Sequence, residues 1–209
     1  MQEVITANWV REPHLTIEQL GSMRGLNLRF LDLAGGVAGQ WDVCRAGAGS
    51  SMLAAGLAQQ LGPLSRTQRI AVASCPYALF DLRFENESYW QSRLVQHAPY
   101  RVADDSLDSD VVDFTRLALF YAWHVSSTAG LAAQILLGMS PVTVNAFRGL
   151  GVNSLPGLAA SEAVNLSARW RNSAGYWNAL IGAAERADPS ALRRVQLYGL
   201  QLAAAARLP

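Results

Sequence analysis

Lysine is missing from this sequence, and all 17 of its basic residues are arginine. A Walker-type loop uses a lysine to reach the β- and γ-phosphates of a nucleotide, so the glycines from Gly35 to Gly49 cannot complete one. Schiff-base catalysis and mechanisms that use a lysine as base are excluded for the same reason. The absence of lysine therefore removes several large classes of enzyme.

Charged side chains are also scarce, at 16% of the 209 residues, compared with roughly 25% in an average soluble protein. A surface with so few charges is expected to be covered in part by partners. The net charge is only +1, without the cationic excess that is typical of nucleic-acid-binding domains. We therefore expect the partners to be other proteins and not nucleic acid, although a local basic patch on one face stays open.

Cysteine is rare, and Cys44 and Cys75 do not form a CxxC motif. A chain of this length needs no disulfide to hold its core together, so we interpret both as small buried hydrophobic residues in a reducing compartment. The stretch from Met1 to His14 has no apolar run that resembles a signal peptide. These features predict an intracellular protein.

A membrane span is not expected either. The stretch from Leu117 to Phe147 contains no charged side chain and is long enough in principle to cross a bilayer. Polar residues and the helix breakers Gly130 and Pro141 divide it into two shorter pieces. Pieces of this length suit a buried helical hairpin.

No catalytic, cofactor or metal site is predicted. The run from Gly21 to Gly25 places its serine one position too early for the nucleophile elbow of a serine hydrolase. The histidines His14, His97 and His124 do not have the helical spacing that zinc sites use. We interpret His124 as a neutral core residue hydrogen-bonded to a carbonyl. The chain is therefore predicted not to be an enzyme.

Signals for helix ends are frequent and the alternation typical of strands is nearly absent, which predicts an all-α fold. We expect one compact multi-helix domain over residues 1–209. Thr16-Ile17-Glu18-Gln19 and Ser65-Arg66-Thr67-Gln68 match the capping box, so each should begin a helix. The glycines between these motifs predict a flexible loop over residues 36–51 and a short helix from Met52 to Leu61.

The longest helix is predicted from Asp110 to Val125 and should be the central one. Its apolar residues recur at helical spacing, which places Phe114, Leu117, Tyr121 and Val125 on the face toward the core. This helix should pack against most of the others.

The second half of the chain is predicted to be helical as well. A helix from Leu131 to Leu137 should end at Gly138. Ser140-Pro141 and Asp188-Pro189 have the serine or aspartate and the proline that begin helices, and the second of them should start an amphipathic last helix. Only Phe80 to Phe84 alternates apolar with charged residues, which allows at most one short strand pair. No repeat of 20 to 50 residues is evident.

Two charged patches and two tryptophans are candidates for binding partners. The acidic patch precedes the central helix, where carboxylates are stabilised by the positive end of the helix dipole. The basic patch lies on the outer side of the last helix, and opposite charges can orient two different partners. The tryptophans lie in the glycine-rich loop and between two arginines, and exposed tryptophans often anchor interfaces. The candidates are Asp104, Asp105, Asp108 and Asp110, then Arg193 and Arg194, and finally Trp41 and Trp170.

A DNA-binding function is the alternative. The segment from Leu131 to Leu137, the turn at Gly138 and the segment from Pro141 to Gly149 can be drawn as a helix-turn-helix. Its recognition helix offers only Asn145 and Arg148 for reading bases. A helical transcription regulator that binds DNA with a partner subunit therefore stays open as the second hypothesis.

Four segments spread over nearly the whole chain resemble one family. They are Cys75–Phe84, Leu117–His124, Leu137–Met139 and Gly199–Pro209. The chain resembles the SctK-type accessory subunit of bacterial type III secretion, in the divergent form encoded in hrp clusters of plant-associated proteobacteria. The stretch from Ala132 to Ala160 also resembles the D subunit of the flagellar master regulator, which keeps the DNA-binding alternative open.

The first resemblance implies a non-enzymatic, all-helical adaptor without cofactors. Such subunits belong to the sorting platform at the cytoplasmic face of the inner membrane and are peripheral to that membrane. They link the cytoplasmic domain of an inner-membrane ring protein to the pod protein that receives the ATPase complex. The expected partners are therefore those two proteins.

Overall fold

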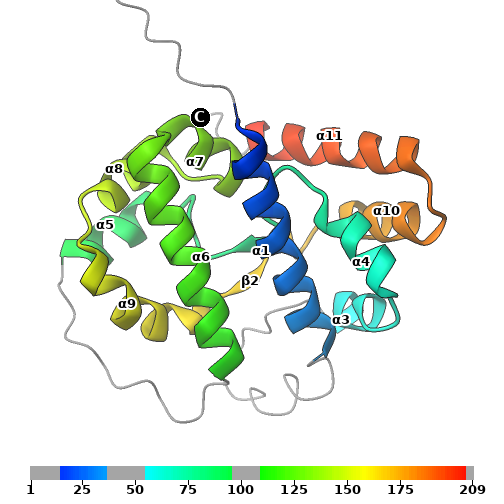
Figure 1. Ribbon diagram of the computed structural model, residues 1–209, viewed down its shortest axis with the longest axis horizontal. Coiled ribbons are helices and arrows are strands. Elements are labelled where there is room, and N and C mark those ends of the chain that lie inside the picture. The colour runs from blue at the N-terminus through cyan, green and yellow to red at the C-terminus, as the bar shows by residue number, and fades with distance from the viewer. Residues whose placement is uncertain (1–14, 37–54, 96–108, 206–209) are drawn as a thin grey trace, which may run out of the picture.

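A computed structural model describes residues 15–36, 55–95 and 109–205 of the chain (Figure 1). In this part of the chain, helices predominate and a single pair of two-residue strands is present, which confirms the all-α prediction. In chain order, the elements are α1 (Ile17–Gly36), α3 (Ala55–Leu61), α4 (Arg66–Ala73), β1 (Phe80–Asp81), α5 (Glu87–Val95), α6 (Ser109–Thr128), α7 (Gly130–Leu137), α8 (Pro141–Arg148), the 3₁₀ helix η1 (Val152–Ser154), α9 (Leu155–Glu162), the 3₁₀ helix η2 (Ala163–Asn165), β2 (Ser167–Ala168), α10 (Ala174–Glu185) and α11 (Pro189–Ala205).

Both predicted capping boxes are confirmed. Before α1, the side chain of Gln19 accepts from the Thr16 amide at 2.9 Å, and Thr16 Oγ1 accepts from the Gln19 amide at 3.1 Å. Ser65 and Gln68 make the same two bonds before α4. These motifs satisfy amides that have no partner inside the helix, so they fix where each helix begins.

The predicted ends of three later helices are also confirmed. Gly138 ends α7 in the left-handed conformation, with φ of 74°. Ser140 Oγ accepts from the Thr143 amide and begins α8. Asp188 begins α11, where its carboxylate accepts from the amides of Ser190 and Ala191. Local sequence therefore determined these boundaries.

Three expectations need correction. The predicted loop over residues 36–51 does not include Gly36, because α1 continues to that residue; the other residues of the loop lie outside the described part. The helix α6 does contact α1, α7, α8 and α9, as expected of a central helix. However, Leu117 is 41% exposed, and the small residues Ala118 and Ala122 face the core in its place. His124, expected in the core, is exposed.

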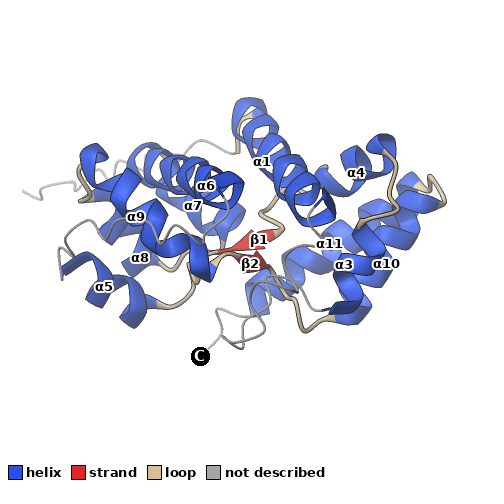
Figure 2. Cartoon of the chain, turned by 90° about the horizontal axis from the view of Figure 1, so that it is seen from below, coloured by secondary structure: helices blue, strands red, loops and turns tan. Residues whose placement is uncertain are grey.

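The helices form two groups on either side of the short strand pair (Figure 2). We name them by their longest helices. The α1 lobe contains α1, α3, α4, α10 and α11, and the α6 lobe contains α5, α6, α7, α8 and α9. The strands β1 and β2 lie where the chain crosses between the lobes, and α1 also contacts α6. One continuous cluster of buried side chains includes residues of both lobes.

The two halves of the described chain share an order of elements, and we call these halves the repeats. The first has the order α1, α3, α4, β1, α5, and the second has the order α6, α7, α8, α9, β2, α10, in which α7 lies between the counterparts of α1 and α3. Both strands and the helices that follow them start at a constant spacing of 87 residues (80 to 167, and 87 to 174). The identities at this spacing are few, the clearest being Tyr89-Trp90 and Tyr176-Trp177. Both α1 and α6 have 20 residues and run in opposite directions in Figure 1.

The strand pair itself is arranged symmetrically. Phe80 lies opposite Ala168, and Asp81 lies opposite Ser167, so the first position of each strand meets the second position of the other. Two residues after each strand, Arg83 and the corresponding Trp170 both have a positive φ, of 60° and 50°. The two repeats therefore share this backbone feature after their strands.

The repeats exchange their last helices. The helix α5 belongs to the first repeat by sequence, yet it packs against α8 of the α6 lobe. Reciprocally, α10 of the second repeat packs against α3 and α4 of the α1 lobe. Each lobe is therefore built from parts of both repeats.

Asn27 holds the crossing segment in place. Its side chain is fully buried on α1 and donates from Nδ2 to the carbonyl of Tyr77 at 2.8 Å, with longer bonds to those of Ala73 and Cys75. Its Oδ1 accepts from the Leu79 amide at 2.8 Å. One amide thereby satisfies the backbone of a buried segment that belongs to no helix.

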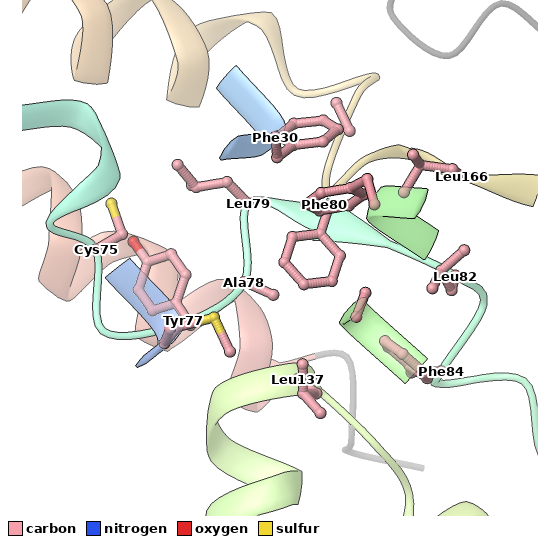
Figure 3. Close-up of a cluster of buried hydrophobic side chains, with 14 of the residues drawn as sticks. Phe30, Cys75, Tyr77, Ala78, Leu79, Phe80, Leu82, Phe84, Leu137 and Leu166 are labelled. Carbon is pink, nitrogen blue, oxygen red and sulfur yellow. The ribbon is translucent and has the colours of Figure 1, made fainter. Parts of the chain in front are cut away.

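The same segment supplies the centre of the core. Figure 3 shows that residues 75–84 run through the buried cluster beside Phe30 and Leu137. The rings of Phe30 and Phe80 are 6.0 Å apart, and Phe80 meets Phe114 edge to face at 5.1 Å. These rings join α1, β1 and α6, so core packing at the crossing links the two lobes.

We predict that Asn27→Ala destabilises the protein by about 3 kcal/mol, because it leaves several buried backbone groups without a hydrogen-bond partner. Urea unfolding followed by circular dichroism measures the free energy. Asn178→Ala, at an exposed position of α10, is the control and should change it by less than about 0.5 kcal/mol. A loss below about 1 kcal/mol for Asn27→Ala would show that the crossing segment is held by packing alone.

Candidate partner-binding surfaces

The last helix, α11, covers one side of the α1 lobe. The Tyr77 hydroxyl donates to the Gln196 carbonyl at 3.1 Å, and the Gln196 side chain donates to Ser74 Oγ at 3.0 Å. Gly199 lies directly against Tyr77 and Tyr176, with no room for a Cβ. The absence of a side chain at Gly199 therefore lets α11 approach the lobe closely.

The opposite side of α11 carries the predicted basic patch. Arg193 and Arg194 are exposed, as the helical periodicity indicated. One turn later, Leu197 is 55% exposed and Tyr198 is 46% exposed. We call these four residues the α11 outer face. Arginine and tyrosine are enriched among the residues that contribute most to protein interfaces.

Electrostatic interactions at the start of α11 stabilise the beginning of this helix. The pKa of Asp188 is lowered, first by the hydrogen bond from the Ala191 amide and further by that from Ser190 and by the charges of Arg194 and Arg186. A carboxylate at the helix N-terminus is also favoured by the helix dipole. Asp188 therefore stays ionised and keeps the helix start fixed at neutral pH.

Asp110, one residue of the acidic patch, lies on a different lobe from the basic patch. Asp110 is exposed in the first turn of α6, while α11 lies on the other lobe (Figures 1 and 2). The other acidic candidates and one tryptophan lie outside the described residues; they are Asp104, Asp105, Asp108 and Trp41. Of the acidic patch, the structure thus places only Asp110 within its described part.

Trp170 is only partly exposed. Its ring meets those of Tyr77 and Tyr176 edge to face at 5.4 and 5.0 Å. The guanidinium of Arg169 lies over the same ring at 4.6 Å. Most of this side chain therefore supports the α1 lobe beneath α11, and a smaller part faces solvent.

The predicted recognition helix of the helix-turn-helix packs one side against the core, while Asn145 and Arg148 are exposed. The helix α8 contacts α5, α6 and α7, and its residues Val144 and Phe147 are buried. Arg148 donates from Nε to the Ser126 carbonyl at 2.9 Å, which directs it toward the end of α6. Asn145 is exposed. Few side chains of α8 are therefore positioned to read a base edge.

Corresponding positions of the two repeats form two different buried networks. In the α6 lobe, Glu162 is fully buried and accepts from the Tyr89 hydroxyl at 2.5 Å and from Arg93 Nε at 2.7 Å. Asn165 donates to the same carboxylate at 2.7 Å. Because both oxygens are occupied, this carboxylate is placed to hold α5 against α9.

The equivalent network in the α1 lobe is built around Cys75, which corresponds to Glu162. The thiol lies 3.8 Å from the Tyr176 hydroxyl, which in turn lies 3.1 Å from that of Tyr77. Burial raises the pKa of Cys75 to about 12 despite these hydrogen bonds. The interpretation of Cys75 as a small buried residue is confirmed, and Cys44 lies outside the described residues.

Sequence reasoning missed these networks because Tyr89 and Tyr176 are far from Glu162 and Cys75 in the chain. The repeated Tyr-Trp dipeptide was the one local signal for them.

In the described ranges, no group of three or more His, Cys, Asp or Glu side chains is placed to hold a metal ion. No helix in those ranges is both long and apolar enough to span a membrane. Comparison of the chain with protein-family models, with curated proteins and with solved structures gives no match.

We predict that two Gly→Ala substitutions change the stability of the protein in opposite directions. Gly199→Ala should destabilise the protein by about 2 kcal/mol, because the added methyl overlaps the Tyr77 hydroxyl. Gly25→Ala, on α1 with open space around it, should stabilise it by about 0.5 kcal/mol through helix propensity. Thermal unfolding compares the two variants. Equal effects of the same sign would show that α11 does not pack closely on Tyr77.

We also predict that Cys75 is unreactive in the folded protein. A thiol whose pKa is about 12 carries almost no thiolate near neutral pH. In a Cys44→Ser variant, the thiol reagent DTNB should label Cys75 only after the protein is unfolded in guanidinium chloride. Rapid labelling of the native variant at about pH 8 would contradict this placement of the thiol.

Proposed function

We propose that this protein is a non-enzymatic adaptor that binds other proteins, with the α11 outer face as one binding surface. The observation that carries the proposal is that Leu197 and Tyr198 are exposed beside Arg193 and Arg194 on a helix whose other side is fixed to the α1 lobe. A rigidly held helix loses little conformational entropy on binding. Its mixed apolar and basic surface fits a partner with an apolar stripe and carboxylates.

The resemblance to SctK-type subunits supports a more specific role. We place the adaptor in the sorting platform of a type III secretion system, at the cytoplasmic face of the inner membrane. There it would link the cytoplasmic domain of the ring protein to the pod protein that receives the ATPase complex. The helical fold is compatible with this role.

A DNA-binding regulator is the second candidate. The exposed Asn145 on α8 favours it. The contacts of Val144 and Phe147 with the core, and the bond from Arg148 to α6, speak against it. The near-zero net charge also provides little general attraction to phosphates.

We predict that the double variant Arg193→Glu, Arg194→Glu binds one partner at least about tenfold more weakly, because it places like charges against the partner's carboxylates. The assay is a pull-down of the ring protein's cytoplasmic domain and of the pod protein from the same secretion system. Arg116→Glu, a charge reversal at an exposed position of α6 on the other lobe, is the matched control.

Three outcomes separate the parts of this proposal. If the wild type binds a partner and the double variant binds it equally well, the α11 outer face is excluded as the binding surface. No binding of either protein by the wild type would remove the role in secretion. A gel shift with mixed-sequence DNA that disappears as salt is raised would instead favour the regulator.

A further inference from the structure

We draw no further inference here: the strongest candidate, the amino terminus of α7 where the Arg148 guanidinium lies against Gly130, is a helix end beside a cation already bonded to the Ser126 carbonyl, and nothing else in the described part of the chain points to a ligand there.

Discussion

The side-chain amide of Asn27 fixes the chain where the two repeats cross, and the two lobes depend on that crossing. Its four hydrogen bonds reach the backbone on both sides of Pro76 and end at Leu79, one residue before β1. The strand can then pair with β2, and α5 is carried into the α6 lobe. A single buried polar group thus does for an irregular segment what a ladder of backbone bonds does for a longer strand.

The two repeats share an order of elements but differ in the chemistry of corresponding positions. Cys75 and Glu162 each meet the tyrosine of the exchanged helix. The thiol of Cys75 lies 3.8 Å from the Tyr176 hydroxyl, whereas Glu162 accepts a hydrogen bond from Tyr89 and also forms an ion pair with Arg93. Tyr77 and Val164 differ as well, and only Tyr77 lies beneath α11. A fold whose halves differ in this manner presents different surfaces on its two lobes, which suits a protein that connects unlike partners.

The sequence was sufficient for local features. The capping boxes at Thr16 and Ser65, and the turn at Gly138, depend on neighbouring residues alone, so their patterns predicted the helix ends. The core face of α6 was harder, because Ala118 and Ala122 are buried by close helix approach and not by their own size. The exchange of α5 and α10 was not visible, since it arises from contacts between distant segments with few identities. Arg193 and Arg194 were placed correctly by helical periodicity, whereas the exposure of Leu197 and Tyr198 depends on how α11 docks.

The exchange of helices also has a consequence for how the molecule responds to cleavage. A protease cut in the connection from α5 to α6 separates the polypeptide into two fragments of similar length, yet neither fragment contains a whole lobe. In the amino-terminal fragment, α5 would pack against α8 of the other fragment. In the carboxyl-terminal fragment, α10 would pack against α3 and α4. Because each lobe contains helices of both fragments, we expect the fragments to stay associated after a cut at that point.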